Sequence, residues 1–217
     1  TGECLAVRNR PGNMRSSEGA AETLKSVLPR VLAHFEKVLV RGDSDFDRKD
    51  IRDVVEQAGA FFAFVARETG SRPVMAESLP EEAWQPFLTR DARARQAHAS
   101  EAGFVPRNKK RNRRRLCARR RGYKDIMLTK QWVAEVRWTP PDGDTPYRLV
   151  LRRQLIEERA GERFLFARYR YCYVLTNLPE DVTAHEVIDA TYQRCDQENI
   201  IEQMGSGLAA WRMPVAE

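Results

Sequence analysis

Hydrophobic positions in the first third of the chain switch between continuous runs and helical spacing. Two continuous apolar runs, at 38–41 (VLVR) and 61–66 (FFAFVA), predict strands that are buried on both faces. Between them, Ile51 and Val54 fall on one face of a helix predicted over 48–60. A strand, a helix and a second strand in this order are typical of a parallel sheet covered by helices. We therefore predict a layered α/β domain.

Two further elements are predicted before these. Residues 4–8 (CLAVR) have the composition of a short strand, and a Pro-Gly turn follows them. Ser16 or Ser17 is then expected to cap a helix that is kinked or restarted at Pro29. Both elements belong with the α/β pattern.

The pattern changes over 67–125, which is polar and contains several prolines. Alternation of apolar and polar positions returns at 132–138, 147–156 and 163–178, with turn residues between these segments. Arginines occupy many of the polar positions, so we predict antiparallel strands with one face toward solvent. We therefore predict that a basic, β-rich insertion follows the first part of the α/β domain.

The last predicted element is a long helix over 184–204. Thr183 and Glu186 form the T-x-x-E pattern of a capping box at its start. The expected organisation is an α/β core in two pieces with the insertion between them. The three segments are 1–66 (first part of the core), 67–165 (insertion) and 166–217 (final strand and helix).

Charge is concentrated in one segment of the chain. The formal net charge is +6, yet residues 107–124 alone hold eleven Lys and Arg and no acid. Such a block is common in solvated tails, but beside a mildly acidic remainder it favours a polyanionic partner, nucleic acid first. The cations expected to bind DNA phosphates are Lys109, Lys110, Arg111, Arg113, Arg114, Arg115, Arg119, Arg120 and Arg121.

Cysteine spacing and hydropathy indicate where the chain acts. The four cysteines show no CxxC spacing, and no apolar run approaches the roughly 20 residues of a membrane helix. The first residues lack the apolar core of a secretory signal. A reducing, cytoplasmic compartment and no membrane partner are expected.

Three carboxylates directly follow the strand at 38–41, namely Asp43, Asp45 and Asp47. One Asp is common in a turn, and Asp47 is placed to cap the helix that follows, so each has an ordinary structural explanation. Three acids together are more than a turn requires. Hard divalent cations prefer carboxylate oxygens, so this strand end is also a candidate metal site.

A second candidate acid, Glu198, lies on the predicted C-terminal helix. By helical spacing we place Thr191, Arg194 and Glu198 on one face, with Val187 and Ile188 on the other side, packed on the sheet. Glu198 has an ordinary explanation as a partner of Arg194 at i,i+4. If Glu198 faces the strand end, the two acids could bind a pair of cations of the kind that promotes phosphodiester displacement.

These stretches resemble the DDE transposases of bacterial insertion sequences. VLVRGDSDF is similar to the strand that carries the second catalytic acid in that family, which corresponds to Asp43. TYQRCDQENIIEQMGSG is similar to its Y-x2-R-x3-E-x6-K helix, in which the Arg corresponds to Arg194 and the catalytic Glu to Glu198. The resemblance extends over nearly the whole chain.

The resemblance implies a ribonuclease-H-like core, incomplete at its N-terminus, with a β-rich insertion before the catalytic helix. It implies DNA transposition through metal-dependent cleavage and strand transfer, with Asp43 and Glu198 as catalytic and metal-binding residues and Arg194 on a phosphate. Mg²⁺ or Mn²⁺, in a two-metal arrangement, would be the cofactor. The partner would be double-stranded DNA of element ends and target, bound by a homodimer in a bacterial, nucleoid-associated setting.

The chain departs from the family pattern at three places. Thr191 stands where the family has Tyr, and Gly205 stands where it has Lys. The first catalytic Asp of the family would lie upstream of Thr1, so we expect a C-terminal portion that is inactive by itself. Two alternatives stay open: a non-catalytic DNA-binding remnant, and a ribonuclease-H-like nuclease that only hydrolyses, because the same acids serve hydrolysis and transfer.

Overall fold

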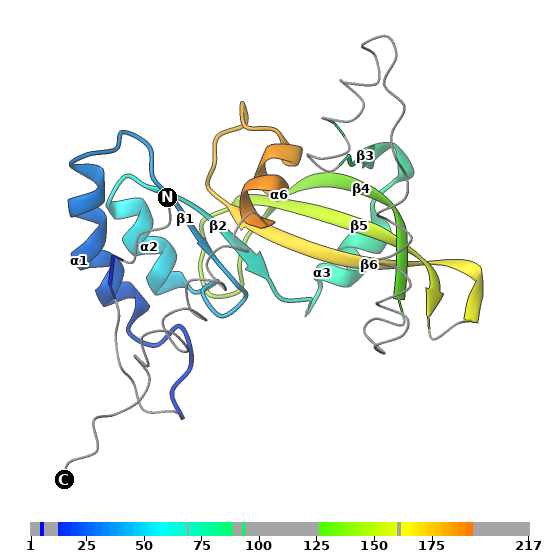
Figure 1. Cartoon of the computed structure of the whole chain (residues 1–217), viewed down its shortest axis with the longest axis horizontal. Helices are drawn as coiled ribbons and strands as arrows, with labels where there is room; N and C mark the ends of the chain where they lie inside the picture. Colours follow the sequence, from blue (N-terminus) through cyan, green and yellow to red (C-terminus); the bar gives the residue numbers. More distant parts are fainter. Residues whose placement is uncertain are drawn as a thin grey trace, which may run out of the picture. The chain divides into compact units, whose positions relative to one another are not determined.

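The protein has a mixed α/β fold, which confirms the predicted class (Figure 1). The computed structural model describes residues 5–6, 13–68, 70–88, 93, 126–159 and 162–192. The helices are α1 (Ala20–Leu32), α2 (Lys49–Gln57), α3 (Arg72–Ser78), η1 (Glu81–Ala83) and α6 (Ala184–Tyr192). The strands are β1 (Leu39–Gly42), β2 (Phe61–Ala66), β3 (Gln85–Pro86), β4 (Ile126–Trp138), β5 (Tyr147–Arg159) and β6 (Glu162–Thr176). They form one sheet in the order β1-β2-β6-β5-β4-β3.

The β1–α2–β2 segment matches its sequence pattern. β1 and β2 are parallel neighbours with Leu39 opposite Phe61, as expected for strands joined by a helix. Ile51 and Val55 of α2 are fully buried, and α2 contacts β2. Gly59 ends the helical segment with a positive φ of 73°, a conformation that costs glycine little. The predicted order of strand, helix and strand is therefore confirmed, but the prediction that β1 is buried on both faces is wrong, because Leu39 and Val40 are half-buried and Arg41 is exposed.

The start of α1 differs from the prediction. Its N-cap residue is Gly19, with φ 72°, and no side chain caps the helix. Ser16 instead donates a hydrogen bond from its hydroxyl to Asp45, so the predicted serine cap is wrong. The helix continues past Pro29 to Leu32. Of the strand predicted over 4–8, only Leu5 and Ala6 are described, and neither lies in a strand.

In the described part of the segment 67–125, for which the sequence predicts no element, lie α3, η1 and β3. α3 begins with Pro at its first turn, which suits a helix start because proline lacks an N–H donor. η1 and the two-residue β3 follow it, and β3 pairs antiparallel with β4. β4 also begins six residues earlier than expected, at Ile126.

α6 begins at the predicted capping box. The Thr183 backbone N–H donates to the Glu186 carboxylate at 2.8 Å, and the Glu186 N–H donates to the Thr183 hydroxyl at 3.3 Å. Thr191 is fully buried together with Val187, and its hydroxyl donates to the Val187 carbonyl at 2.7 Å. The prediction that these two residues lie on different faces is wrong, because positions i and i+4 share one side of a helix.

The chain divides into two compact units. The first comprises 1–67, 136–149 and 174–217, and the second comprises 68–135 and 150–173. In the first unit the Phe62 ring stacks on Phe64 at 5.0 Å and meets the Tyr147 ring edge-on at 5.2 Å. The predicted boundaries at residues 66 and 165 stay a prediction.

The second unit has an arginine among aromatic rings. The guanidinium of Arg153, only 5% exposed, lies 4.5 Å from the ring centroid of Trp84, 4.9 Å from that of Trp132 and 4.8 Å from that of Tyr169. Glu81 accepts a hydrogen bond from it and neutralises its charge. Burial of this cation is thus compensated by a carboxylate and by ring quadrupoles.

Within the described ranges, no helix combines the length and the apolar character that a membrane crossing requires.

Candidate active-site carboxylates

Asp43 lies immediately after β1, where the backbone turns sharply. The Phe46 N–H donates to the Asp43 carbonyl at 3.1 Å, which closes the turn. Gly42 permits it: a Cβ at this position would lie 2.7 Å from the Phe46 Cβ and 3.1 Å from a ring carbon of Phe64. The sequence Gly-Asp therefore places Asp43 at the C-terminal end of a parallel strand, the edge at which α/β sheets commonly hold their functional side chains.

The Asp43 carboxylate is oriented by its own turn. Its Oδ1 accepts a hydrogen bond from the Asp45 N–H at 3.0 Å, an Asx-turn contact. The residue is half-buried. Among the residues that the structure describes, no lysine, arginine or histidine forms an ion pair with it. Asp43 thus keeps a carboxylate that is held in place and has no cationic partner in that part of the chain.

Asp45 connects three segments near this turn. It accepts hydrogen bonds from the Ser16 hydroxyl at 2.7 Å and from the guanidinium of Arg67. The bond from Ser16, followed by that from Arg67, lowers the pKa of the Asp45 carboxyl below its usual value. Arg67 directly follows β2, so its contact is possible because the C-terminal ends of parallel strands meet at one edge.

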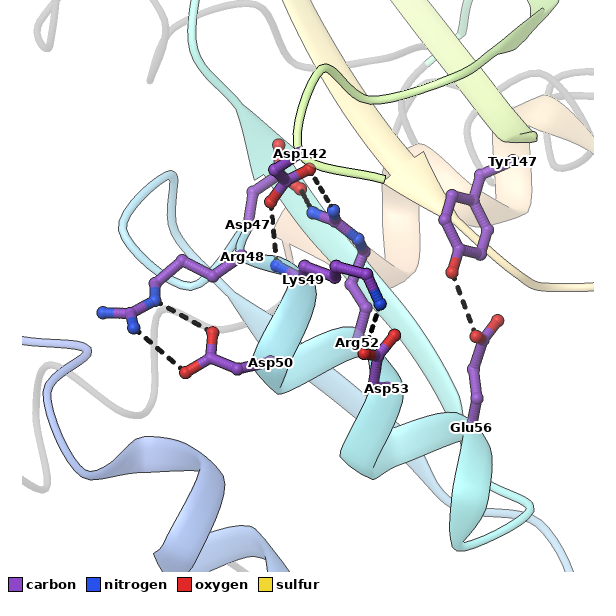
Figure 2. Close-up of polar contacts among 9 residues, drawn as sticks. All are labelled: Asp47, Arg48, Lys49, Asp50, Arg52, Asp53, Glu56, Asp142 and Tyr147. Carbon is purple, nitrogen blue, oxygen red and sulfur yellow. Dashed lines mark hydrogen bonds and ion pairs between the residues drawn. The ribbon is translucent and has the colours of Figure 1, made fainter. Parts of the chain in front are cut away.

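Asp47 is a structural acid, paired with a buried arginine of α2 (Figure 2). Arg52 Nη1 lies 2.6 Å from Asp47 Oδ1, with side chains 2% and 8% exposed. Asp142, in the turn after β4, also accepts a hydrogen bond from Arg52, and its Oδ2 accepts one from the Lys49 N–H at 2.9 Å. Asp142 therefore caps α2, and the prediction that Asp47 does so is wrong.

Tyr147 joins the same helix from the beginning of β5. Its hydroxyl donates to Glu56 Oε2 at 3.0 Å, and its ring centroid lies 5.8 Å from the Arg52 guanidinium (Figure 2). Burial, with a smaller contribution from the Glu56 hydrogen bond, raises the pKa of Tyr147 to about 12. Sequence reasoning missed Arg52, Tyr147 and Asp142. The sequence contains one signal that could have identified Arg52 as a buried residue, namely its position beside the apolar residues of an amphipathic helix.

β1 also contacts the helix that leads to the second candidate acid. Arg41 Nη1 donates to the Ala190 carbonyl of α6 at 2.7 Å, across 149 positions of the chain. Arg41 precedes Asp43 by two residues, and Ala190 precedes Glu198 by eight. The hydrogen bond therefore joins the strand that precedes Asp43 to α6, whose described part ends at Tyr192.

A comparison with known protein families identifies the chain. Residues 1–217 match the family described as Transposase DDE domain group 1. The chain belongs to this family. The resemblance inferred from Asp43 and Glu198 is thereby confirmed at the level of a DDE transposase. No curated protein matches the chain.

Much of the predicted transposase site lies outside the described residues. This applies to Glu198, Arg194 and the nine cations of the basic segment from Lys109 to Arg121. Within the described part of the transposase domain, no three His, Cys, Asp or Glu side chains form a group that could hold a metal ion. Of the acids after β1, Asp45 and Asp47 have cationic partners, which leaves Asp43 as the candidate ligand.

Proposed function

We propose that this transposase domain cuts and joins DNA at the ends of an insertion sequence, with Asp43 and Glu198 binding divalent cations. The observation that carries the proposal is the Arg41–Ala190 hydrogen bond, which joins the strand end that carries Asp43 to α6. The second support is the state of Asp43 itself, oriented by Asp45 N–H and without an ion pair in the described residues.

The donor chemistry of Asp43 fits Mg²⁺ or Mn²⁺. Carboxylate oxygens are the ligands that hard divalent cations prefer, and a half-buried, oriented carboxylate loses little freedom on binding one. When bound, such cations supply Lewis acidity to a water or to a DNA 3′-hydroxyl. Asp43 and Glu198 would hold them, and Arg194 would position a phosphate.

The fold around Asp43 supports a ribonuclease-H-like core. β1 and β2 are parallel, α2 connects them, and the acid follows β1 at the C-terminal edge. In this interpretation β3, β4 and much of β5 and β6 belong to the insertion that separates the second and third acids. The ribonuclease-H-like topology is part of the proposal.

Double-stranded DNA is the proposed partner, in the form of element ends and target. The nine cations between Lys109 and Arg121 would neutralise phosphates, and each such contact steepens the salt dependence of binding. Because two ends are joined, a homodimer is the proposed assembly, and the bacterial nucleoid is the proposed setting. That the 217-residue chain is inactive by itself also stays a prediction.

Metal binding to the 217-residue chain tests the two carboxylates without requiring activity. In an Mn²⁺ titration followed by electron paramagnetic resonance, Asp43→Asn and Glu198→Gln should each weaken binding at least about tenfold, as loss of a ligand or its support does. Asp50→Asn is the matched control, because Asp50 is exposed and paired with Arg48. Wild-type affinity in the Asp43→Asn chain would contradict the proposed site.

DNA assays separate the proposed function from its alternatives. With pre-nicked element ends and a target duplex, a transposase yields strand-transfer products, whereas a nuclease yields only shorter fragments. A DNA-binding remnant would show salt-dependent binding and no metal-dependent product, in this chain or in a longer protein that contains it. Metal-dependent joining that Glu198→Gln abolishes would support the proposal.

A further inference from the structure

Arg52 is a buried arginine that two carboxylates from different segments share (Figure 2). Its Nη1 donates to Asp47, whose side chain is 8% exposed, and its Nη2 donates to Asp142, whose side chain is 46% exposed. A guanidinium presents its donors in a fixed planar fork, whereas a lysine ammonium is a point charge on a flexible stem. Asp142 therefore fixes the direction of the fork, and the fork fixes the direction of Asp47.

The loop 43–47 connects β1 to this ion pair. The Phe46 N–H donates to the Asp43 carbonyl at 3.1 Å, and the Asp45 N–H donates to the Asp43 carboxylate at 3.0 Å. Asp47 directly follows Phe46, so a displacement of Asp47 moves the turn that contains both donors. The orientation of the Asp43 carboxylate therefore depends on where Asp47 is held.

A second ion pair of the same loop constrains it less. The Asp45 carboxylate pairs with Arg67, and the two side chains are 36% and 58% exposed. An ion pair that is open to water contributes little to the order of a segment, whereas breaking a buried pair is strongly unfavourable. Of these two ion pairs, that of Arg52 constrains the loop more strongly.

Stability alone does not account for an ion pair at this position. Apolar side chains of similar volume often replace a buried ion pair without loss of stability, because no charge then has to be removed from water. A hydrogen-bonded pair supplies a fixed direction, which apolar packing supplies less strictly. Contacts that orient a metal ligand in this way raise the affinity of the site for its metal.

We propose that Arg52 is a positioning residue for the Asp43 carboxylate. By holding Asp47 between α2 and the turn after β4, Arg52 sets the orientation in which Asp43 binds a divalent cation. The inference rests on the proposed function in taking Asp43 as a metal ligand. It adds α2 and the turn that carries Asp142 to the elements that determine this site.

The first test measures Mn²⁺ binding by electron paramagnetic resonance. Arg52→Lys keeps the charge and loses the fork, and it should weaken binding about tenfold, the low end of the range for residues that orient a ligand. Arg48→Met removes a cation from the exposed pair with Asp50 and should not weaken binding. Wild-type affinity in Arg52→Lys, with a wild-type circular dichroism spectrum, would overturn the proposal.

The sign of the effect in Arg52→Met separates positioning from electrostatics. Loss of a nearby positive charge strengthens the binding of a cation, because it removes a repulsion. Loss of an orienting contact weakens the binding of a cation. We expect weaker Mn²⁺ binding in Arg52→Met, and stronger binding would show that Arg52 acts on the site only through its charge.

The second test separates positioning from stability. Asp47→Leu/Arg52→Met replaces the pair by apolar side chains, so its urea midpoint should lie near that of wild type. Its Mn²⁺ affinity should nevertheless stay about tenfold below wild type. Val55→Ala leaves a cavity under the same helix and should lower the urea midpoint with wild-type affinity. If the apolar pair restores stability and affinity together, the role of Arg52 is structural and the proposal fails.

Hydrogen exchange tests the orientation of Asp43 without any metal. In EDTA, the Asp45 N–H should lose protection in Arg52→Lys, while the amides of β2 keep theirs. If Asp43→Asn retains wild-type Mn²⁺ affinity, the proposed function fails, and exchange at Asp45 still decides whether Arg52 orients Asp43. Unchanged exchange at Asp45 in Arg52→Lys would reject the positioning role and leave Asp43 as the proposed ligand.

Discussion

Arg52 and Asp47 form a buried ion pair, with Arg52 Nη1 2.6 Å from Asp47 Oδ1 and the side chains 2% and 8% exposed. The pair joins α2 to the loop that begins with Asp43. Asp142 shares the same guanidinium and caps the same helix (Figure 2). These contacts hold the loop that begins with Asp43 against α2, and Asp43 itself takes no part in them.

Removal of the Arg52 guanidinium should strongly destabilise the protein. Arg52→Met leaves the Asp47 carboxylate buried without its cation, and breaking a buried pair in this way costs about 3–5 kcal/mol. Arg48→Met removes an equal charge from the exposed pair with Asp50 and should cost no more than about 1 kcal/mol. Urea unfolding followed by circular dichroism measures both, and equal losses would show that burial of the pair contributes nothing.

The cap of α2 gives a second prediction. Asp142→Ala leaves the Lys49 N–H without its acceptor and should lower the free energy of unfolding by about 1–2 kcal/mol, within the range for a lost N-cap. Asp144→Ala, in the same turn, should change it by no more than about 0.5 kcal/mol. Amide hydrogen exchange gives a local readout, because only the Asp142 variant should lose protection in the first turn of α2. Equal hydrogen-exchange protection in the two variants would show that Asp142 does not cap α2.

Gly42 couples stability to the placement of Asp43. In Gly42→Ala the added methyl group meets the Phe46 Cβ at 2.7 Å, which is not the movable end of a side chain, so the turn must shift. We expect a loss of about 1–3 kcal/mol, as for overpacked sites, together with weaker Mn²⁺ binding. Gly143→Ala is the control, since its nearest contacts lie at 3.9 Å in the flexible Lys49 side chain. Unchanged Mn²⁺ affinity in Gly42→Ala would show that the turn does not position a ligand.

The elements that could be predicted are those set by neighbouring residues. β2 was predicted from its continuous apolar run, and the start of α6 was predicted from Thr183 and Glu186, which contact each other within one turn. Asp43 was chosen as a candidate from the same kind of local pattern, Gly-Asp after an apolar run, and its role as a ligand stays a prediction. Periodicity and short motifs contain this information in the sequence itself.

Two of the wrong predictions, the caps of α1 and α2, depend on partners that are distant in the sequence. Ser16 is bonded to Asp45, 29 positions away, and does not cap α1. The true cap of α2, Asp142, lies 93 positions from Lys49. Arg52 appears in the sequence as one more surface cation, and only the fold shows that two carboxylates surround it. At each of these positions a tertiary contact is present in place of the local interaction that the sequence predicts.

Tyr147 makes the stability of the protein sensitive to alkaline pH. Its folded-state pKa is about 12 against an ordinary value of 10.0, chiefly because burial disfavours the phenolate. A group whose pKa is raised on folding contributes stability that is complete below the unfolded pKa and is lost as pH rises through the folded value. The free energy of unfolding should therefore fall between pH 10 and pH 12 more steeply in wild type than in Tyr147→Phe. Tyr171 and Tyr173, whose pKa values are also raised by burial, are present in both proteins, so their contributions to the pH dependence of stability cancel in this comparison. Parallel pH profiles for the two proteins would mean that Tyr147 ionises as readily in the folded state as in the unfolded one.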